Sequence, residues 1–552
     1  MVQKVSARSG RSRAAGGRRP SKRAEGGGIS KLPKSSWSNA YREKWRWDSV
    51  AWGTHCVDCP PGNCPFRVYV KDGAVVREEQ AGAQGVVEPG VPDMNPMGCQ
   101  KGAAWSQMLS AKERVLHPLK RAGERGEGKW QRVSWDDALT EIADGLIDAI
   151  QEAGPESIME FSSALQGGMM VTFPFGRFMG LLGSVRTDSN ADIGDFNSGL
   201  FETFGQAASC SSAEDGFHSD LILIWHSNPV YTNIPAYHVV PESRYGGAEV
   251  VTIAPDASPS TVHADYYVPV KPGGDAALAL AMCQVLIEEG LYNASFVKQQ
   301  TDLPLLVRTD TRRFLRQSDV EGEGSDEQFY FFDTKTGGPV EAPRGTLSLA
   351  GVKPALEGRS QVALADGASV EVAPVFELLK ERLTEYEPGR ASQLCGSSPA
   401  LIRKLARMVA GRKTKVLLGF NAAKYYHGDL MERSISLVLA LTGNWGRKGT
   451  GLGNPVTGLL NGAFLFPRKQ EAGPDEISKI LGLRSAVLGA LKTQDPTLSD
   501  EMVNIDLMAR GAPGDSTGPS AFFWYHHTGH RERWNRKEWS DPAMTRSFDE
   551  YV

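Results

Sequence analysis

Four side chains near the start of the chain have the types and spacing of soft-metal ligands. His55, Cys59, Cys64 and Cys99 follow the pattern H-x3-C-x4-C-x34-C. Three thiolates and one imidazole can close the four corner sites of a cubane iron–sulfur cluster, and soft sulfur ligands favour iron–sulfur or zinc over hard cations. Zinc sites usually take their ligands from two short-spaced pairs, whereas here one group of ligands is followed by one distant cysteine. The pattern therefore favours a cluster that transfers single electrons.

The first ligand of this group is ambiguous from spacing alone. Cys56 adjoins His55, and C-x2-C-x4-C from Cys56 is also a feasible ligand set. Lys101 follows Cys99 by two residues. A solvated surface lysine is the plain interpretation of Lys101. The functional one places its cation beside the cluster, where it stabilises the reduced state and bridges to the next redox centre.

Polar residues that follow apolar runs predict a second site. Asn228 follows LILIW (221–225), Asp256 follows AEVVTIAP (248–255), and Asp275 follows YYVPV (266–270) and a Pro-Gly-Gly turn. Open α/β sheets bind nucleotide-like ligands beyond the carboxyl ends of their strands, and helix N-termini attract phosphates. Ordinary turn chemistry explains each piece taken alone, so the prediction depends on their grouping.

A third group lies in GFNAAKYYHGDLMER (419–433) and LTGNWGRKGTGLGNP (441–455). The glycines of the second segment, Gly443 and Gly449 among them, predict a loop whose backbone approaches a bulky polar ligand. The sequence contains no Walker A motif and no G-x-G-x-x-G after a first strand. ATP and NAD are therefore poorly supported as ligands.

The elements that carry these residues alternate between short apolar runs and helical patterns, which predicts a doubly wound parallel α/β sheet. Strands are expected at 221–225, 248–255, 266–270 and 416–421, and helices at 134–154, 235–246, 274–290, 374–386, 398–411 and 430–442. The run FRVYVKDGAVVREEQ (66–80) predicts a hairpin that turns at Asp72-Gly73. A Gly/Thr/Asp-rich stretch predicts a β insertion at about 320–375.

Length and composition set the outer limits. A chain of 552 residues needs several lobes, and a net charge of −4 gives no case for nucleic-acid binding. No apolar run reaches the ~18–20 residues of a membrane span, so any membrane link is expected through a partner. Residues 1–36 are expected to form a disordered basic tail. No apolar segment follows Arg18-Arg19, so a cytoplasmic location is expected and a periplasmic one stays open.

In combination, these motifs resemble the catalytic subunits of the molybdopterin oxidoreductase (dimethyl sulfoxide reductase) family. The similarity is closest to the respiratory nitrate reductase α-subunit and its selenate, chlorate and perchlorate reductase, ethylbenzene and dimethylsulfide dehydrogenase and nitrite oxidoreductase relatives. It is carried by the His/Cys spacing, RVYVKDG, MGLLGSVRTDSNADIGDF (179–196) and KYYHGDLMER, over roughly residues 38–465. It implies a multi-lobed α/β fold with an N-terminal iron–sulfur domain; nothing in the chain resembles the family's C-terminal β domain.

The resemblance implies a role for each candidate residue. His55, Cys59, Cys64 and Cys99 would bind a [4Fe–4S] cluster, which selects His55 over Cys56, although the PPGN loop before Cys64 is one residue longer than the family's usual loop. Asp195, in GDFNSG, matches the aspartate that ligates molybdenum, and Lys101 matches the basic residue between cluster and pterin. The implied molybdenum cofactor is Mo-bis(molybdopterin guanine dinucleotide). Asn228, Asp256 and Asp275 would hold one guanine dinucleotide arm, and Asn421, His427, Gly443 and Gly449 would face the pterins.

The implied activity is two-electron oxygen-atom transfer at molybdenum, first of all the reduction of a small oxyanion such as nitrate. The alternatives are a hydroxylating dehydrogenase of a hydrocarbon or sulfide and a truncated, non-catalytic electron-transfer subunit. Implied partners are an iron–sulfur β subunit, a membrane or haem electron-transfer subunit and a separate chain that supplies the C-terminal domain. The expected domains are an iron–sulfur domain (37–120), a molybdopterin-binding lobe (121–204 and 415–552) and a doubly wound lobe (205–414).

Overall fold

The computed structural model describes residues 45–55, 64–80, 89–92, 98–160, 178–179, 181–186, 198–204, 211, 214–419, 422–425 and 427–453, with residues 486, 489–491 and 493. The chain divides into two compact units. The first comprises Met1–Cys56, Asn63–Gly85 and Asn95–Ala138, and the second comprises Val57–Gly62, Val86–Met94 and Leu139–Val552. None of the helices within the described ranges is long and apolar enough to cross a membrane.

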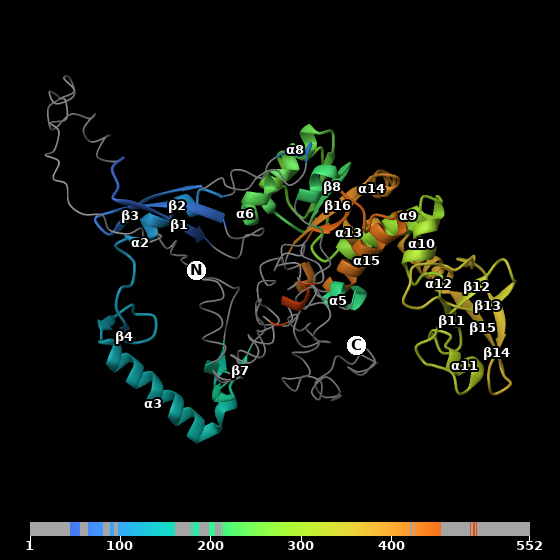
Figure 1. Cartoon of the computed structure of the whole chain (residues 1–552), viewed down its shortest axis with the longest axis horizontal. Coiled ribbons are helices and arrows are strands. Elements are labelled where there is room, and N and C mark those ends of the chain that lie inside the picture. Colours follow the sequence, from blue (N-terminus) through green and yellow to red (C-terminus); the bar gives the residue numbers. More distant parts are fainter. Residues whose placement is uncertain are drawn as a thin grey trace. The chain divides into compact units, whose positions relative to one another are not determined.

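The first unit is built on an antiparallel sheet in the order β1-β2-β3, shown in blue in Figure 1. Its strands are β1 (Ser49–His55), β2 (Cys64–Lys71) and β3 (Ala74–Gln80). The predicted hairpin turns at Asp72 and Gly73, whose φ angles of 51° and 76° are those of a type I′ turn. Strand β1 was not predicted, and it pairs with β2 from Ser49 opposite Val70 to His55 opposite Cys64.

Short elements complete this unit. The 3-10 turn η1 (Gly102–Ala104) and helix α2 (Trp105–Leu109) pack against β3. A small hairpin of β4 (Leu119–Arg121) and β5 (Trp130–Arg132) follows. The long amphipathic helix α3 (Trp135–Ala153) comes next, and from Leu139 onward it belongs to the second unit. Helix α3 begins where Ser134 Oγ accepts the backbone N–H of Asp137 at 3.1 Å, as its N-cap sequence predicts.

The second unit contains the predicted parallel sheet, in the order β10-β9-β8-β16-β17. Its strands are β8 (Leu221–Trp225), β9 (Glu249–Ala254), β10 (Tyr266–Pro269), β16 (Thr414–Leu418) and β17 (Gly451–Gly453). All four neighbouring pairs are parallel. The sequence LILIW forms β8, and every residue of this strand is buried, as expected for a strand covered on both faces.

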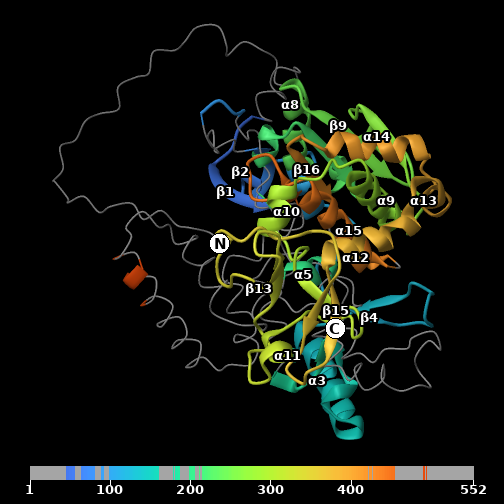
Figure 2. The same ribbon diagram turned by 90° about the vertical axis from the view of Figure 1, so that its right-hand side faces the viewer.

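Strand β8 contributes side chains to two hydrophobic cores, because successive side chains lie on opposite faces of the sheet. Leu221, Leu223 and Trp225 join the larger core and Ile222 and Ile224 the smaller one. Helix α8 (Val239–Tyr245) contributes to the smaller core. The larger core is formed with α9 (Asp275–Glu288), α12 (Val375–Leu383), α13 (Pro388–Cys395), α14 (Pro399–Val409) and α15 (Gly428–Leu441), which are grouped together in Figure 2. Helices therefore cover both faces, which confirms the doubly wound α/β class.

The predicted lobe boundary at residue 414 cuts through this sheet. Strand β16 pairs with β8 along all of its residues, from Thr414 opposite Leu221 to Leu418 opposite Trp225. The segment from β16 to β17 therefore belongs to the same sheet as β8–β10 and not to a separate lobe. The physical reason is that parallel neighbours need a long crossover, so strands distant in sequence can lie side by side.

A β-rich segment lies between α10 (Ala294–Gln300) and α12, where the sequence predicts an insertion. It contains a sheet in the order β11-β15-β14 and a hairpin of β12 and β13. The bounds are β11 (Leu306–Arg308), β12 (Tyr330–Asp333), β13 (Gly338–Glu341), β14 (Ser360–Ala363) and β15 (Ser369–Pro374), with α11 (Gln317–Glu321) between β11 and β12. This segment has its own small core, which includes Leu306, Leu315 and Val372.

Candidate functional site

The strand order of the large sheet reverses between β8 and β16. From β8 the chain proceeds to β9 and β10 on one side, whereas β16 and β17 lie on the other. Trp225 and Leu418, the last residues of β8 and β16, are opposite each other. Doubly wound sheets bind ligands in the crevice beyond such a switch point. The residues that follow these two strands are therefore the first candidates for a ligand site.

His226 and Gly419 follow the two strand ends, and neither was predicted as a site residue. His226 has a φ of 50°, which is uncommon for a residue other than glycine. A Cβ added to Gly419 would lie 1.9 Å from the backbone oxygen of His226, so only glycine permits this approach. The His226 ring meets Tyr425 edge-on, with centroids 4.5 Å apart. Burial lowers the pKa of His226 against the opposing charge of Asp275, which favours a neutral imidazole.

Asn228 and Asp256 both lie at this edge, as predicted. Asn228 precedes the short helix α6 (Pro229–Thr232), and its Oδ1 accepts the hydroxyl of Ser260 at 2.7 Å. Ser260 is buried in the turn after β9, so this hydrogen bond joins the loops that follow β8 and β9. Asp256, directly after β9, is exposed. Two neighbouring loops thus present polar side chains at the carboxyl edge of the sheet.

Asp275 is also at this edge, but its carboxylate is committed inside the protein. The side chain is only 3% exposed, and its Oδ1 accepts the indole Nε1–H of Trp225 at 2.9 Å. Burial raises the pKa of Asp275, and the hydrogen bond from Trp225 and the nearby His226 oppose that rise. The preceding turn is closely packed too, because a Cβ on Gly274 would lie 2.8 Å from Cα of Cys395. A direct contact of Asp275 with a nucleotide arm therefore finds no support in this geometry.

His427 lies at the same edge, whereas the predicted glycine loop does not. His427 precedes α15 and has a left-handed φ of 57°. Helix α15 then crosses the sheet, so Gly443 and Gly449 fall near the opposite edge, before β17. A Cβ on Gly449 would lie 2.2 Å from the backbone oxygen of His218, and one on Gly443 would lie 2.7 Å from Nδ2 of Asn293. At both positions the close approach that requires glycine is to the protein itself.

A buried carboxylate joins α15 to helix α5 (Ser198–Phe204). Glu432 on α15 is 0% exposed, and its Oε2 accepts the backbone N–H of Leu200 at 3.1 Å, with the N–H of Gly199 as a second donor. Its buried Oε1 has no hydrogen-bond partner among the described residues. Burial raises the pKa of Glu432 to about 8, and the charges of Asp429 and Glu202 add to the rise. At pH 7 this side chain therefore holds a proton.

In the first unit, three predicted cluster ligands have backbone positions next to β2: positions 55 and 64 end the paired strands β1 and β2, and Cys99 lies in a segment that packs against Phe66. Positions 55 and 64 are opposite each other, and position 64 has the same strand parity as Phe66. Cys99 is 5% exposed, and Phe66 packs against the glycines that flank it. A Cβ would lie 3.2 Å from Phe66 Cζ at Gly98 and 2.4 Å from it at Gly102. Lys101, next to this turn, is exposed.

Other predicted ligands lie outside the described residues: Cys59, Asp195 and Asn421, together with the alternative ligand Cys56. Among the side chains that the structure does describe, no three His, Cys, Asp or Glu are grouped closely enough to hold a metal ion. The donor chemistry and burial of Cys99 and the opposed backbone positions 55 and 64 fit a cluster at this end of β1 and β2.

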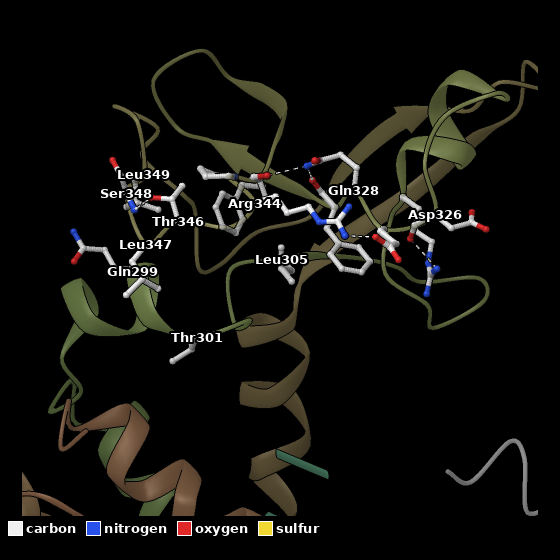
Figure 3. A pocket seen from close by; sticks show the side chains of 16 residues that line it. Gln299, Thr301, Leu305, Asp326, Gln328, Arg344, Thr346, Leu347, Ser348 and Leu349 are labelled. Carbon is white, nitrogen blue, oxygen red and sulfur yellow. Dashed lines mark hydrogen bonds and ion pairs between the residues drawn. The ribbon is translucent and has the colours of Figure 1, made fainter. Parts of the chain in front are cut away.

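A cavity of about 530 Å³ lies apart from this sheet edge, between the end of α10 and the β-rich segment. Figure 3 shows Gln299, Leu347 and Ser348 at one end and Asp326 at the other. Arg316 is placed over the ring of Phe329 and donates to the backbone oxygen of Asp326. The polar lining residues Arg316, Gln328 and Arg344 form hydrogen bonds and ion pairs within the β-rich segment, so this cavity is separate from the sheet edge.

Comparison with known proteins agrees with this architecture. The family model "Molybdopterin oxidoreductase" matches residues 114–496, and the chain belongs to this family. The α subunit of dimethylsulfide dehydrogenase from Rhodovulum sulfidophilum is 41% identical over 76% of this chain and 46% of its own length. The chlorate reductase α subunit of Ideonella dechloratans shows the same identity and coverage. A respiratory nitrate reductase α subunit from Haloferax mediterranei is 38% identical over 78% of this chain and 45% of its own length. The chain thus spans about half the length of the curated relatives it matches.

Proposed function

We propose that this chain forms the cofactor-binding part of a molybdenum oxidoreductase catalytic subunit that reduces a small oxyanion such as nitrate. The observation that carries the proposal is the place of three polar residues at one edge of a sheet within the family-matched region: His226 and Asn228 follow β8, beside the switch point, and Asp256 follows the neighbouring strand β9. A nucleotide arm of Mo-bis(molybdopterin guanine dinucleotide) fits such an edge. When bound, the molybdenum supplies a centre that exchanges an oxo group with the substrate while two electrons are transferred.

The residues at this edge have different roles in binding the nucleotide arm. Asn228 uses its Oδ1 for Ser260, and its NH2 group donates no hydrogen bond to a described residue, so it can donate to a ligand. Asp256 can accept from a ribose hydroxyl or a guanine N–H. Gly419 permits the close approach of the ends of β8 and β16 at His226, whose backbone is left-handed. Asp195, which precedes α5, is the proposed protein ligand of molybdenum.

Electrons would pass through a [4Fe–4S] cluster held by His55, Cys59, Cys64 and Cys99. The register of β1 and β2 and the burial of Cys99 support this ligand set. We assign the next electron carrier to a separate iron–sulfur β subunit, with a haem or membrane subunit beyond it. The remaining half of a typical relative's length would come from further polypeptide or from another chain.

A second candidate is oxidation of a sulfide or a hydrocarbon, with water as the source of oxygen. It is favoured by one observation: the dimethylsulfide dehydrogenase subunit is as similar to this chain as the chlorate reductase subunit, at 41% identity each. The two reactions run the same centre in opposite directions. Assays with reduced viologen and nitrate or chlorate, and with an oxidised dye and a thioether, distinguish them.

Metal and nucleotide analysis tests the proposal. The chain is produced anaerobically with its co-transcribed partners, and molybdenum, iron and acid-released guanine nucleotide are measured. We expect molybdenum and nucleotide in the wild type and a loss of both in Asn228→Ala with iron retained. Asn293→Ala is a matched control, because Asn293 caps α10 by accepting the N–H of Phe296 and lies away from the edge. Iron without molybdenum in the wild type would contradict the proposal and favour an electron-transfer subunit.

A further inference from the structure

Glu78 on β3 is a carboxylate in an unusual place. It is 8% exposed, and its buried Oε2 accepts no hydrogen bond from any residue in the described part of the chain. Among the described residues it forms no ion pair. Burying a charged group without a partner is costly, so a buried carboxylate of this kind calls for an explanation.

The strand register places Glu78 on the same face of the sheet as Phe66 and Gln80, the face against which the segment around Cys99 packs. Glu78 is opposite Val68, and two residues further along β3 Gln80 is opposite Phe66. Gln80 and Phe66 both pack on Gly98, the neighbour of Cys99: a Cβ on Gly98 would lie 2.7 Å from Cγ of Gln80. Two residues of strand span about 7 Å. Glu78 therefore lies on the order of 10 Å from Cys99, beneath the η1–α2 segment.

The adjacent Glu79 provides a built-in comparison. It projects to the opposite face, where its carboxylate accepts the hydroxyl of Tyr69 at 2.5 Å and pairs with Arg77. Arg77 also lies over the ring of Trp45, with its guanidinium carbon 3.8 Å from the ring centroid. The charge of Glu79 is thus neutralised by a cation, whereas helix α2, which packs over the Glu78 side, has no ionisable residue.

We infer that Glu78 lowers the reduction potential of the iron–sulfur cluster at this face of the β1–β3 sheet. The inference rests on the proposed cluster. Reduction adds one negative charge to the cluster, supplied by a single-electron carrier such as an iron–sulfur protein, and a fixed carboxylate nearby opposes that charge. At about 10 Å and an effective dielectric constant of about 20, the opposition changes the reduction equilibrium roughly tenfold. For one electron, a tenfold change is about 59 mV.

The test is a redox titration of the full chain, followed by low-temperature EPR of the reduced cluster with dithionite as reductant. Glu78→Gln should raise the midpoint potential by about 59 mV, and Glu78→Met should raise it similarly, so either variant suffices if the other does not fold. Glu78→Asp should stay near the wild type. Glu79→Gln, the matched control, should move the potential by less than about a third of that shift.

Two outcomes overturn the inference. Iron-loaded Glu78→Gln or Glu78→Met protein with the wild-type potential would show that the charge of Glu78 does not reach the cluster. A change of the midpoint potential in Glu79→Gln as large as that in Glu78→Gln would show that the effect does not depend on the face of the sheet from which the carboxylate projects. Wild-type protein without iron would overturn the proposed cluster itself, and the inference with it, so the two failures are distinguishable.

Discussion

The indole of Trp225, at the end of the central strand β8, donates a 2.9 Å hydrogen bond to the buried carboxylate of Asp275 at the start of α9. This bond joins the switch point of the sheet to the first turn of its most buried helix. It also gives Asp275 a structural role at a position where the sequence suggested a contact with a nucleotide.

Substitution of Asp275 should therefore lower the free energy of unfolding rather than remove a direct contact with the nucleotide. Asp275→Ala leaves the indole N–H buried without an acceptor, which should lower the free energy of unfolding by about 1–3 kcal/mol in urea titrations. Asp256→Ala, at an exposed position of the same edge, should change it by less than about 0.5 kcal/mol and reduce bound guanine nucleotide instead. Equal stability losses in the two variants would argue against this division of roles.

Glu432 predicts a pH dependence of stability with a definite sign. Its pKa is raised from 4.5 to about 8, so the folded state binds more protons than the unfolded state between these values. The free energy of unfolding should fall as the pH rises through this window, by at most about 1.4 kcal/mol per pH unit from this group. Glu432→Gln keeps an acceptor for Leu200 and removes the titration, so its stability relative to wild type should improve from pH 5.5 to pH 7.5.

Urea titrations at several pH values measure this difference directly. Glu152→Gln, at an exposed position on α3, serves as the control and should stay within about 0.5 kcal/mol of the wild type. A stability difference between Glu432→Gln and wild type that is constant with pH would show that Glu432 does not carry the proton we assign to it.

The choice between His55 and Cys56 can be decided by substitution. Because His55 is opposite Cys64 in the β1–β2 register, His55→Ala should alter or lose the cluster, whereas Cys56→Ala should keep about four irons per chain and the wild-type EPR signal. Cys99→Ala is the reference for a lost ligand. A normal cluster in His55→Ala and none in Cys56→Ala would assign the first ligand to Cys56.

Two glycines of the 443–451 loop should respond differently to the same change. Gly449 and Gly446 both have a positive φ, 81° and 69°, but only Gly449 faces an obstacle, the backbone oxygen of His218 at 2.2 Å from an added Cβ. Gly446→Ala should cost about 1–2 kcal/mol through backbone strain alone, and Gly449→Ala clearly more. Thermal unfolding of the two variants measures the comparison, and equal costs would contradict the packing described here.

The sequence predicted the elements of the second unit well and its side-chain environments poorly. The run LILIW predicted a strand buried on both faces. The Gly-Asp start and the apolar residues that follow it predicted helix α9. The left-handed backbone of His226 could not be predicted, because the residue that it approaches closely, Gly419, follows a strand almost 200 residues later in the sequence. The lobe boundary at residue 414 failed for the same reason: local pattern does not specify which distant strand becomes a neighbour.

The buried carboxylates were missed for a different physical reason. Glu78 stands in the polar run REEQ and Glu432 in the helical run DLMER, where a charged letter normally marks the solvent face. Burial of both depends on what packs over them, α2 in one case and α5 in the other. Alternation from Phe66 across a regular hairpin at Asp72-Gly73 would place Glu79 on that face, and only the register shift between Tyr69 and Val70 places Glu78 there instead.

The pairing of His55 with Cys64 has a consequence for how ligand spacing can drift in evolution. The strands β1 and β2 hold both ends of the segment between His55 and Cys64 in place. An inserted residue therefore lengthens this segment and leaves the positions of His55 and Cys64 unchanged. Lengthening β2 between Cys64 and Phe66 would instead reverse the parity of every residue beyond it. Homologues should therefore differ in length within residues 56–63 and hardly ever between Cys64 and Asp72.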